Sequence, residues 1–126
     1  MLLPQQEVVV DVILVEDHPM MANIIIGGLE KVGFRVILAR NLVEGQEVIT
    51  NNHKHSIAVL LDGSLGNGQL STPLIKLLKK LQYKGKIIAI SDDPDTNEIL
   101  FKSGCTTFCL KKEVLEFVPK TLNKKQ

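Results

Sequence analysis

Short, nearly continuous apolar runs recur along the chain, and the segments between them carry apolar residues at helical spacing. The runs are rich in Val, Ile and Leu and too short to cross a membrane, which is typical of strands buried on both faces of a sheet. We predict five strands, at residues 8–15, 34–39, 57–61, 86–90 and 106–110.

The segments between the predicted strands contain signals for the start and the end of a helix. Pro19 suits a first helical turn, and Gly33 ends the same helix. Asn41, with Glu44 three residues later, has the pattern of a capping box. Pro119 lies inside the last helix, so we expect an irregular first turn or a kink there. The expected helices cover residues 20–32, 41–51, 72–81, 93–103 and 113 onward.

Regular alternation of strands and helices predicts an α/β fold with a parallel sheet covered on both faces. For five such units, right-handed crossovers favour a doubly wound, flavodoxin-like sheet with the strand order 2-1-3-4-5. The 126 residues suit a single domain spanning residues 1–126, with no room for an output domain. Ligands of such sheets bind beyond the carboxyl ends of the strands, so we expect the functional site there.

Composition and charge argue against several classes of partner. Lys and Arg number 15 against 14 Asp and Glu, a net charge of +1 that favours neither nucleic acid nor an anionic membrane. No apolar stretch approaches the ~20 residues of a membrane span, and the first residues show no secretion signal. We therefore expect a cytoplasmic protein whose Cys105 and Cys109 are buried and reduced.

Polar residues stand at the carboxyl ends of four predicted strands: Glu16 and Asp17, Asp62, Ser91 and Lys111. Each has an ordinary structural explanation, such as helix capping or a solvated surface position, but their coincidence at one sheet edge favours a site. Three converging carboxylates repel one another unless a cation joins them, and oxygen ligands suit Mg²⁺ or Mn²⁺ better than Zn²⁺. The hydroxyl and the amine could steady the oxygens of a phosphoryl group.

The segments VILVEDHP, VLLDGSLGNG, IIAIS and GCTTFCLKK, in this order and spacing, resemble the CheY-like receiver domain of two-component response regulators. The resemblance covers nearly the whole chain. It implies a phosphorelay domain that takes a phosphoryl group from a histidine kinase or a histidine phosphotransfer protein. Its signal would pass to an effector protein or a missing output domain, from a monomer or a phosphorylation-linked dimer. Beyond its own aspartyl phosphorylation and dephosphorylation, no enzymatic activity is implied.

The resemblance also assigns roles to individual residues. Asp62 matches the phosphoacceptor, and Glu16 and Asp17 match the acidic pair that holds Mg²⁺ together with Asp62. The backbone carbonyl of Ser64 would complete the protein's share of the metal ligands. Lys111 matches the lysine that pairs with the acceptor and later with the phosphate.

Two further positions match the family's switch. The hydroxyl of Ser91 would turn toward the phosphoryl oxygens, and the ring of Phe108 would turn inward as Ser91 moves. The stretch from Ser91 to Lys111 is two residues shorter than usual, and a gapless comparison would place Ala89 at the hydroxyl position instead. Asp92 replaces a residue that is usually small, so its carboxylate either repels phosphate or points to solvent.

These departures leave two other functions open. Asp92 and the shortened loop are compatible with a receiver-like interaction module that works without phosphorylation. A Mg²⁺-dependent phosphatase on a similar sheet would share the strand-end Asp62, but it ordinarily carries a second acid where this chain has Ser64.

Overall fold

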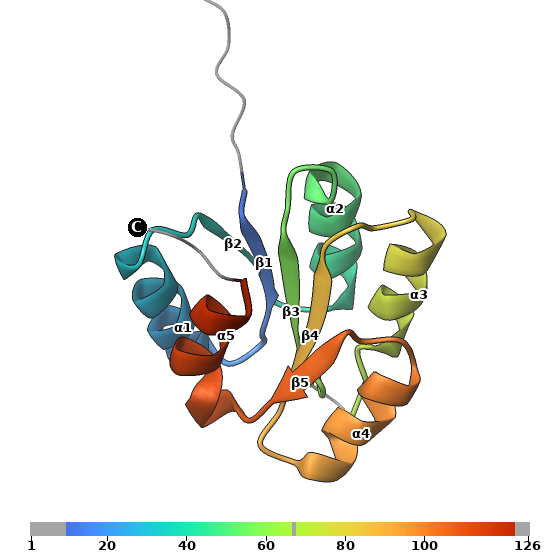
Figure 1. Cartoon of the computed structure of the whole chain (residues 1–126). Helices are drawn as coiled ribbons and strands as arrows, with labels where there is room; N and C mark the ends of the chain where they lie inside the picture. The colour runs from blue at the N-terminus through green and yellow to red at the C-terminus, as the bar shows by residue number, and fades with distance from the viewer. Residues whose placement is uncertain (1–9, 67, 123–126) are drawn as a thin grey trace, which may run out of the picture.

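The described strands run parallel in one sheet with the order β2-β1-β3-β4-β5 (Figure 1), which confirms the predicted flavodoxin-like topology. The computed structural model describes residues 10–66 and 68–122. Its strands are β1 (Val12–Val15), β2 (Val36–Ala39), β3 (Ala58–Asp62), β4 (Lys86–Ile90) and β5 (Thr107–Cys109).

Some predicted strands are longer than the observed ones. β1 begins at Val12, and the predicted strand residues 8 and 9 lie outside the described part of the chain. Phe34 is not in β2, because its backbone N–H donates to Leu29 and its buried ring packs beneath the preceding helix. Thr106 lies just before β5, where its hydroxyl accepts a hydrogen bond from the backbone N–H of Ile87.

Helices cover both faces of the sheet. α1 and α5 pack together over one face, whereas α2 and α3 pack over the other (Figure 1). α4 lies against β4 and β5. The helices are α1 (Pro19–Lys31), α2 (Leu42–Asn52), α3 (Thr72–Lys80), α4 (Pro94–Lys102) and α5 (Val114–Leu122), with a 3₁₀ turn, η1 (Lys111–Glu113), before α5. None of the described helices is long and apolar enough to span a bilayer.

The helix starts follow the capping signals in the sequence. Asn41 accepts a hydrogen bond from the backbone N–H of Glu44, as the predicted capping pattern requires. The Glu44 carboxylate accepts from Arg40 instead of from Asn41, so the reciprocal bond is shifted by one residue. The irregular start predicted for the last helix is the turn η1, and Pro119 lies within α5.

Apolar side chains fill a core on each side of the sheet. β1 and β3 alternate between the two, so Ile13 and Val59 face α2 and α3, whereas Leu14 and Leu60 face α1 and α5. These strands are buried on both faces, as their continuous apolar runs predict. Cys105 and Cys109 are also buried, and burial raises the pKa of each thiol to about 12. The residues at the carboxyl edge of the sheet therefore follow central strands that are packed on both faces.

Candidate functional site

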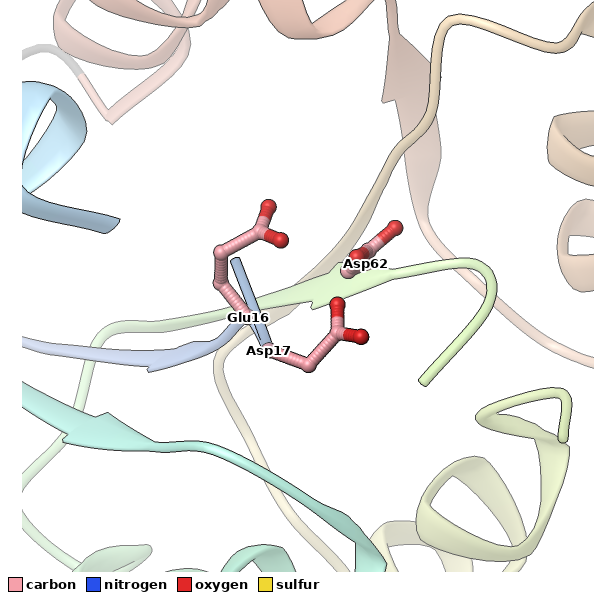
Figure 2. A group of neighbouring side chains, drawn as sticks. All are labelled: Glu16, Asp17 and Asp62. Carbon is pink, nitrogen blue, oxygen red and sulfur yellow. The ribbon is translucent and has the colours of Figure 1, made fainter. Parts of the chain in front are cut away.

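Three carboxylates meet at the carboxyl edge of the two central strands. Glu16 and Asp17 directly follow β1, and Asp62 ends β3. The pairing of Val15 with Leu61 brings Glu16 and Asp62 level with each other across the strands. Each of the three residues offers a carboxylate oxygen within 4.8 Å of the others (Figure 2). The convergence expected from the sequence is therefore present in the structure.

The three acids differ in their exposure to solvent. Glu16 is fully buried and Asp62 is 4% exposed, whereas Asp17 is exposed. Asp17 and Asp62 line an open cleft of about 440 Å³, together with His18, Ser64, Ser91, Asp92, Asp93 and Lys111. Asp62 therefore borders this cleft, whereas Glu16 is not among the residues that line it.

Lys111, at the start of η1, reaches back to the two buried acids. Its Nζ lies 3.1 Å from Oε1 of Glu16 and 3.2 Å from Oδ2 of Asp62, and it donates a hydrogen bond to Oε2 of Glu16. The ammonium group thus offsets part of the repulsion between these carboxylates. Because the side chain of Lys111 is only 17% exposed, water screens this interaction weakly.

Burial and the neighbouring charges shift the pKa values of Asp62 and Lys111. The pKa of Asp62 is raised to about 7 by burial, the largest cause, and by the neighbouring Glu16, against the lowering effect of Lys111. Burial acts to lower the pKa of Lys111, but Asp62 and Glu16 outweigh it, so the net direction is upward. Burial and Glu16 thus outweigh the lowering effect of Lys111 on the pKa of Asp62.

One carboxylate oxygen has capacity for a further partner. Oε1 of Glu16 is buried and has no hydrogen-bond partner among the described residues, although Nζ of Lys111 lies at ion-pair distance. Buried carboxylate oxygens are normally satisfied by hydrogen bonds or by a cation. The cluster of Glu16, Asp17 and Asp62 therefore has a suitable donor set for a hard divalent cation. Ser64 lies beside it and donates its backbone N–H to Oδ1 of Asp62 at 3.4 Å.

The hydroxyl of Ser91 lies at the start of α4. Ser91 lines the cleft, and its Oγ accepts a hydrogen bond from the backbone N–H of Asp93 at 3.1 Å. Ala89, the other residue that a gapless comparison would place here, is fully buried inside β4. Asp93 in turn caps α4 by accepting from Asp95. The hydroxyl is thus connected to the first turn of a helix.

Phe108 lies at the surface of β5, outside the cleft. Its side chain is 45% exposed, and its ring meets that of Phe101 on α4 edge to face, with the centroids 5.6 Å apart. The structure therefore shows an outward position, and the predicted inward turn of this ring stays a prediction.

Two further residues belong to the site in roles that the sequence motifs do not predict. The carboxylate of Asp92 accepts a hydrogen bond from the backbone N–H of Lys111. Asn97 is buried on α4 and bonds to both Ser91 and Cys109. A signal for Asn97 exists in the sequence, because it shares the inner face of α4 with the apolar Leu100, three residues on.

No protein-family model and no curated protein matches the sequence. Solved structures do match. The CheY-like receiver domain protein of Methanospirillum hungatei JF-1 is 20% identical, with a TM-score of 0.75 over 92% of this chain and 95% of that chain. The BeF3-activated receiver domain of Klebsiella pneumoniae RstA is 27% identical, with a TM-score of 0.74 over 90% of this chain and 99% of that chain.

A third match is a Burkholderia pseudomallei response regulator with a phosphorylated aspartic acid, a calcium ion and citrate. It is 20% identical, with a TM-score of 0.71 over 90% of this chain and 71% of that chain. These likenesses agree with the resemblance in the sequence motifs. The chain has the fold of a CheY-like response regulator receiver domain.

Proposed function

We propose that this chain is a phosphoacceptor receiver domain of a two-component phosphorelay and that Asp62 accepts the phosphoryl group. The observation that carries the proposal is the position of Asp62. Its carboxylate lines an open cleft, next to two further acids and 3.2 Å from an ammonium group. This arrangement provides a nucleophile, a place for a cation and a positive charge in one site.

In the proposed reaction, a carboxylate oxygen of Asp62 forms a bond to phosphorus as the bond between phosphorus and the donor imidazole nitrogen breaks. The electron pair of the broken bond stays with the imidazole nitrogen, and the product is an aspartyl phosphate. The same transfer is open to a small donor such as acetyl phosphate, with acetate as the leaving group. The chain thereby catalyses only its own modification.

Glu16, Asp17, Asp62 and the backbone carbonyl of Ser64 would hold Mg²⁺ or, as a substitute, Mn²⁺. When bound, the ion supplies positive charge against the phosphoryl group, which brings about −1.5 to −2 charge into a site rich in carboxylates. The three converging carboxylates and the buried Oε1 of Glu16, which accepts no hydrogen bond from the described residues, support this assignment.

Lys111 and Ser91 would bind the new phosphoryl oxygens. Lys111 already contacts Asp62, so its Nζ needs only a small movement to form an ion pair with the phosphate. Ser91 would exchange its hydrogen bond with the N–H of Asp93 for one with a phosphoryl oxygen. That exchange would re-shape the surface of α4, β5 and α5, with Phe108 moving inward, as a shift between two populated states.

The proposed partners follow from this role. A histidine kinase or a histidine phosphotransfer protein would deliver the phosphoryl group in the cytoplasm. An effector protein, or an output domain outside this sequence, would read the re-shaped surface. The domain would act as a monomer or as a dimer that forms on phosphorylation.

Incubation with Mg²⁺ and acetyl phosphate or phosphoramidate, followed by intact-mass measurement, tests the proposal. We expect one added phosphoryl group on the wild type, none on Asp62→Ala and none when EDTA removes the metal. An unmodified wild type, or equal modification of Asp62→Ala, would overturn it.

A second function, binding of a partner without phosphorylation, is favoured by one observation. Asp92 places another exposed carboxylate at the cleft, where it opposes an incoming phosphoryl group. The two functions differ in their response to confirmed modification of Asp62. Unchanged spectra and unchanged affinity for a partner after modification would favour the second function.

A further inference from the structure

The side chain of Asn97 connects α4 to the ends of two strands. Its Nδ2 donates a hydrogen bond to the backbone carbonyl of Ser91 at 2.8 Å and another to that of Cys109 at 3.2 Å. The backbone N–H of Ser91 donates to the same carbonyl of Cys109 at 3.3 Å. One buried amide therefore joins the helix, the residue after β4 and the last residue of β5.

Burial alone does not explain an asparagine at this position. Asn97 is 1% exposed, and its Oδ1 has no hydrogen-bond partner among the described residues. A buried polar atom without a partner is destabilising, and an apolar side chain would avoid that cost. The feature that an apolar side chain could not replace is the pair of bonds donated by Nδ2.

Two hydrogen bonds, one to the side chain of Ser91 and one to its backbone, connect this residue to α4 and to the residue that caps it. Its hydroxyl accepts from the N–H of Asp93, and its backbone carbonyl accepts from Asn97. In the proposed movement, rotation of the hydroxyl toward a phosphoryl group would carry its oxygen away from the N–H of Asp93 and break the first bond. The second bond does not involve the hydroxyl, so α4 remains attached to Ser91 through Asn97.

We propose that Asn97 is a positioning residue that clamps Ser91, α4 and β5 together and transmits a displacement of Ser91 to the exposed pair of Phe101 and Phe108. Phe108 directly precedes Cys109, and Phe101 lies one helical turn after Asn97, so both rings stand on segments that the clamp holds. The inference rests on the proposed function, because phosphorylation of Asp62 is what would displace Ser91.

The test variant is Asn97→Leu, which keeps a buried side chain of similar size but donates no hydrogen bond. Leu100→Val is the matched control, since Leu100 is fully buried on the same helix and bonds to neither strand end through its side chain. Should Asn97→Leu not fold, Asn97→Ala takes its place with the same expectations.

Hydrogen exchange in the unphosphorylated protein tests the clamp itself. The amide of Ser91 should exchange about tenfold faster in Asn97→Leu than in Leu100→Val, the effect expected from losing a hydrogen bond of ordinary net strength. Equal exchange rates in the two variants would show that Asn97 does not hold the end of β4.

Amide NMR spectra with Mg²⁺ and beryllofluoride, a phosphate mimic, test the transmission. In the wild type and in Leu100→Val, resonances should shift both at Gly63 and Ser64 and at Phe101 and Phe108. In Asn97→Leu, the shifts at Gly63 and Ser64 should persist, whereas those at the two phenylalanines should be largely lost.

If Phe101 and Phe108 shift in Asn97→Leu as much as they do in the wild type, the inference is overturned. An absence of shifts at Gly63 and Ser64 in the wild type would instead contradict the proposed function, and the exchange rates would still decide whether the clamp exists.

Discussion

The backbone N–H of Lys111 donates a hydrogen bond to Oδ1 of Asp92 at 3.0 Å. The two residues follow different strands, β4 and β5, which are neighbours in the sheet. Asp92 is exposed, as one reading of the sequence expected, but its carboxylate also holds the main chain that carries the site lysine. An acid that departs from the family pattern therefore has a local structural role.

Two substitutions of Asp92 separate this hydrogen bond from the charge. Asp92→Ala removes both, and we expect it to lower the free energy of unfolding by about 1 kcal/mol in urea titrations. Asp92→Asn keeps an acceptor oxygen and should lose clearly less stability. Both variants should react with acetyl phosphate a few times faster than the wild type at low salt, with a smaller difference at high salt. An equal loss of stability in both variants would contradict the role of the hydrogen bond.

Lys111→Met should be strongly destabilising when no metal is present. Glu16 and Asp62 would then face each other in a buried site without their ion-pair partner, and such losses cost about 3–5 kcal/mol. Lys102→Met is the control, because Lys102 forms an ion pair with Glu98 in which both side chains are mostly exposed. Urea unfolding in EDTA should show a loss below about 1 kcal/mol for the control. Similar losses for both variants would show that the buried ion pair contributes little.

Mg²⁺ should raise the melting temperature of the wild type, since a ligand that binds only the folded state stabilises it. Asp17→Asn should weaken Mg²⁺ binding by about tenfold or more, because it removes one charged oxygen ligand. Asp95→Asn serves as the control, since Asp95 is an exposed acid in the first turn of α4. Titrations followed by calorimetry measure the affinities, and an unchanged affinity in Asp17→Asn would exclude Asp17 as a ligand.

Gly63 packs against Thr96, and the contact leaves no space for a side chain. A Cβ at residue 63 would overlap Cγ2 of Thr96. Gly63→Ala should therefore destabilise the protein by about 1–3 kcal/mol. Thr96→Ser removes the methyl group and can keep the hydroxyl bond to Asp93, so the double variant should recover much of that loss. A double variant as unstable as the sum of the two single variants would place the strain elsewhere.

The sheet order and the convergence of the acids could be predicted because both depend on periodic features of the sequence. Continuous apolar runs define the strands, and a parallel sheet then brings Glu16, Asp17 and Asp62 to one edge. Strand ends were less predictable. Phe34 has the composition of a strand residue, but it packs beneath α1 instead.

The bonds of Asp92 and Asn97 could not be predicted, because both depend on how separate elements pack. Asp92 accepts from a residue 19 positions later, and Asn97 joins one helix to the ends of two strands. No local pattern specifies such contacts. A polar residue on the inner face of α4 only indicates that some partner is required.

If Asp62 is the phosphoacceptor, the phosphoryl group must be bound to its side chain, and its location can be determined chemically. After reaction with acetyl phosphate and Mg²⁺, hydroxylamine converts an aspartyl phosphate to a hydroxamate, which tandem mass spectrometry can assign to one residue. We expect a hydroxamate at residue 62 alone and none in samples prepared with EDTA. A hydroxamate at residue 17, 92 or 93, or none at residue 62 in a modified protein, would show that Asp62 is not the phosphoacceptor.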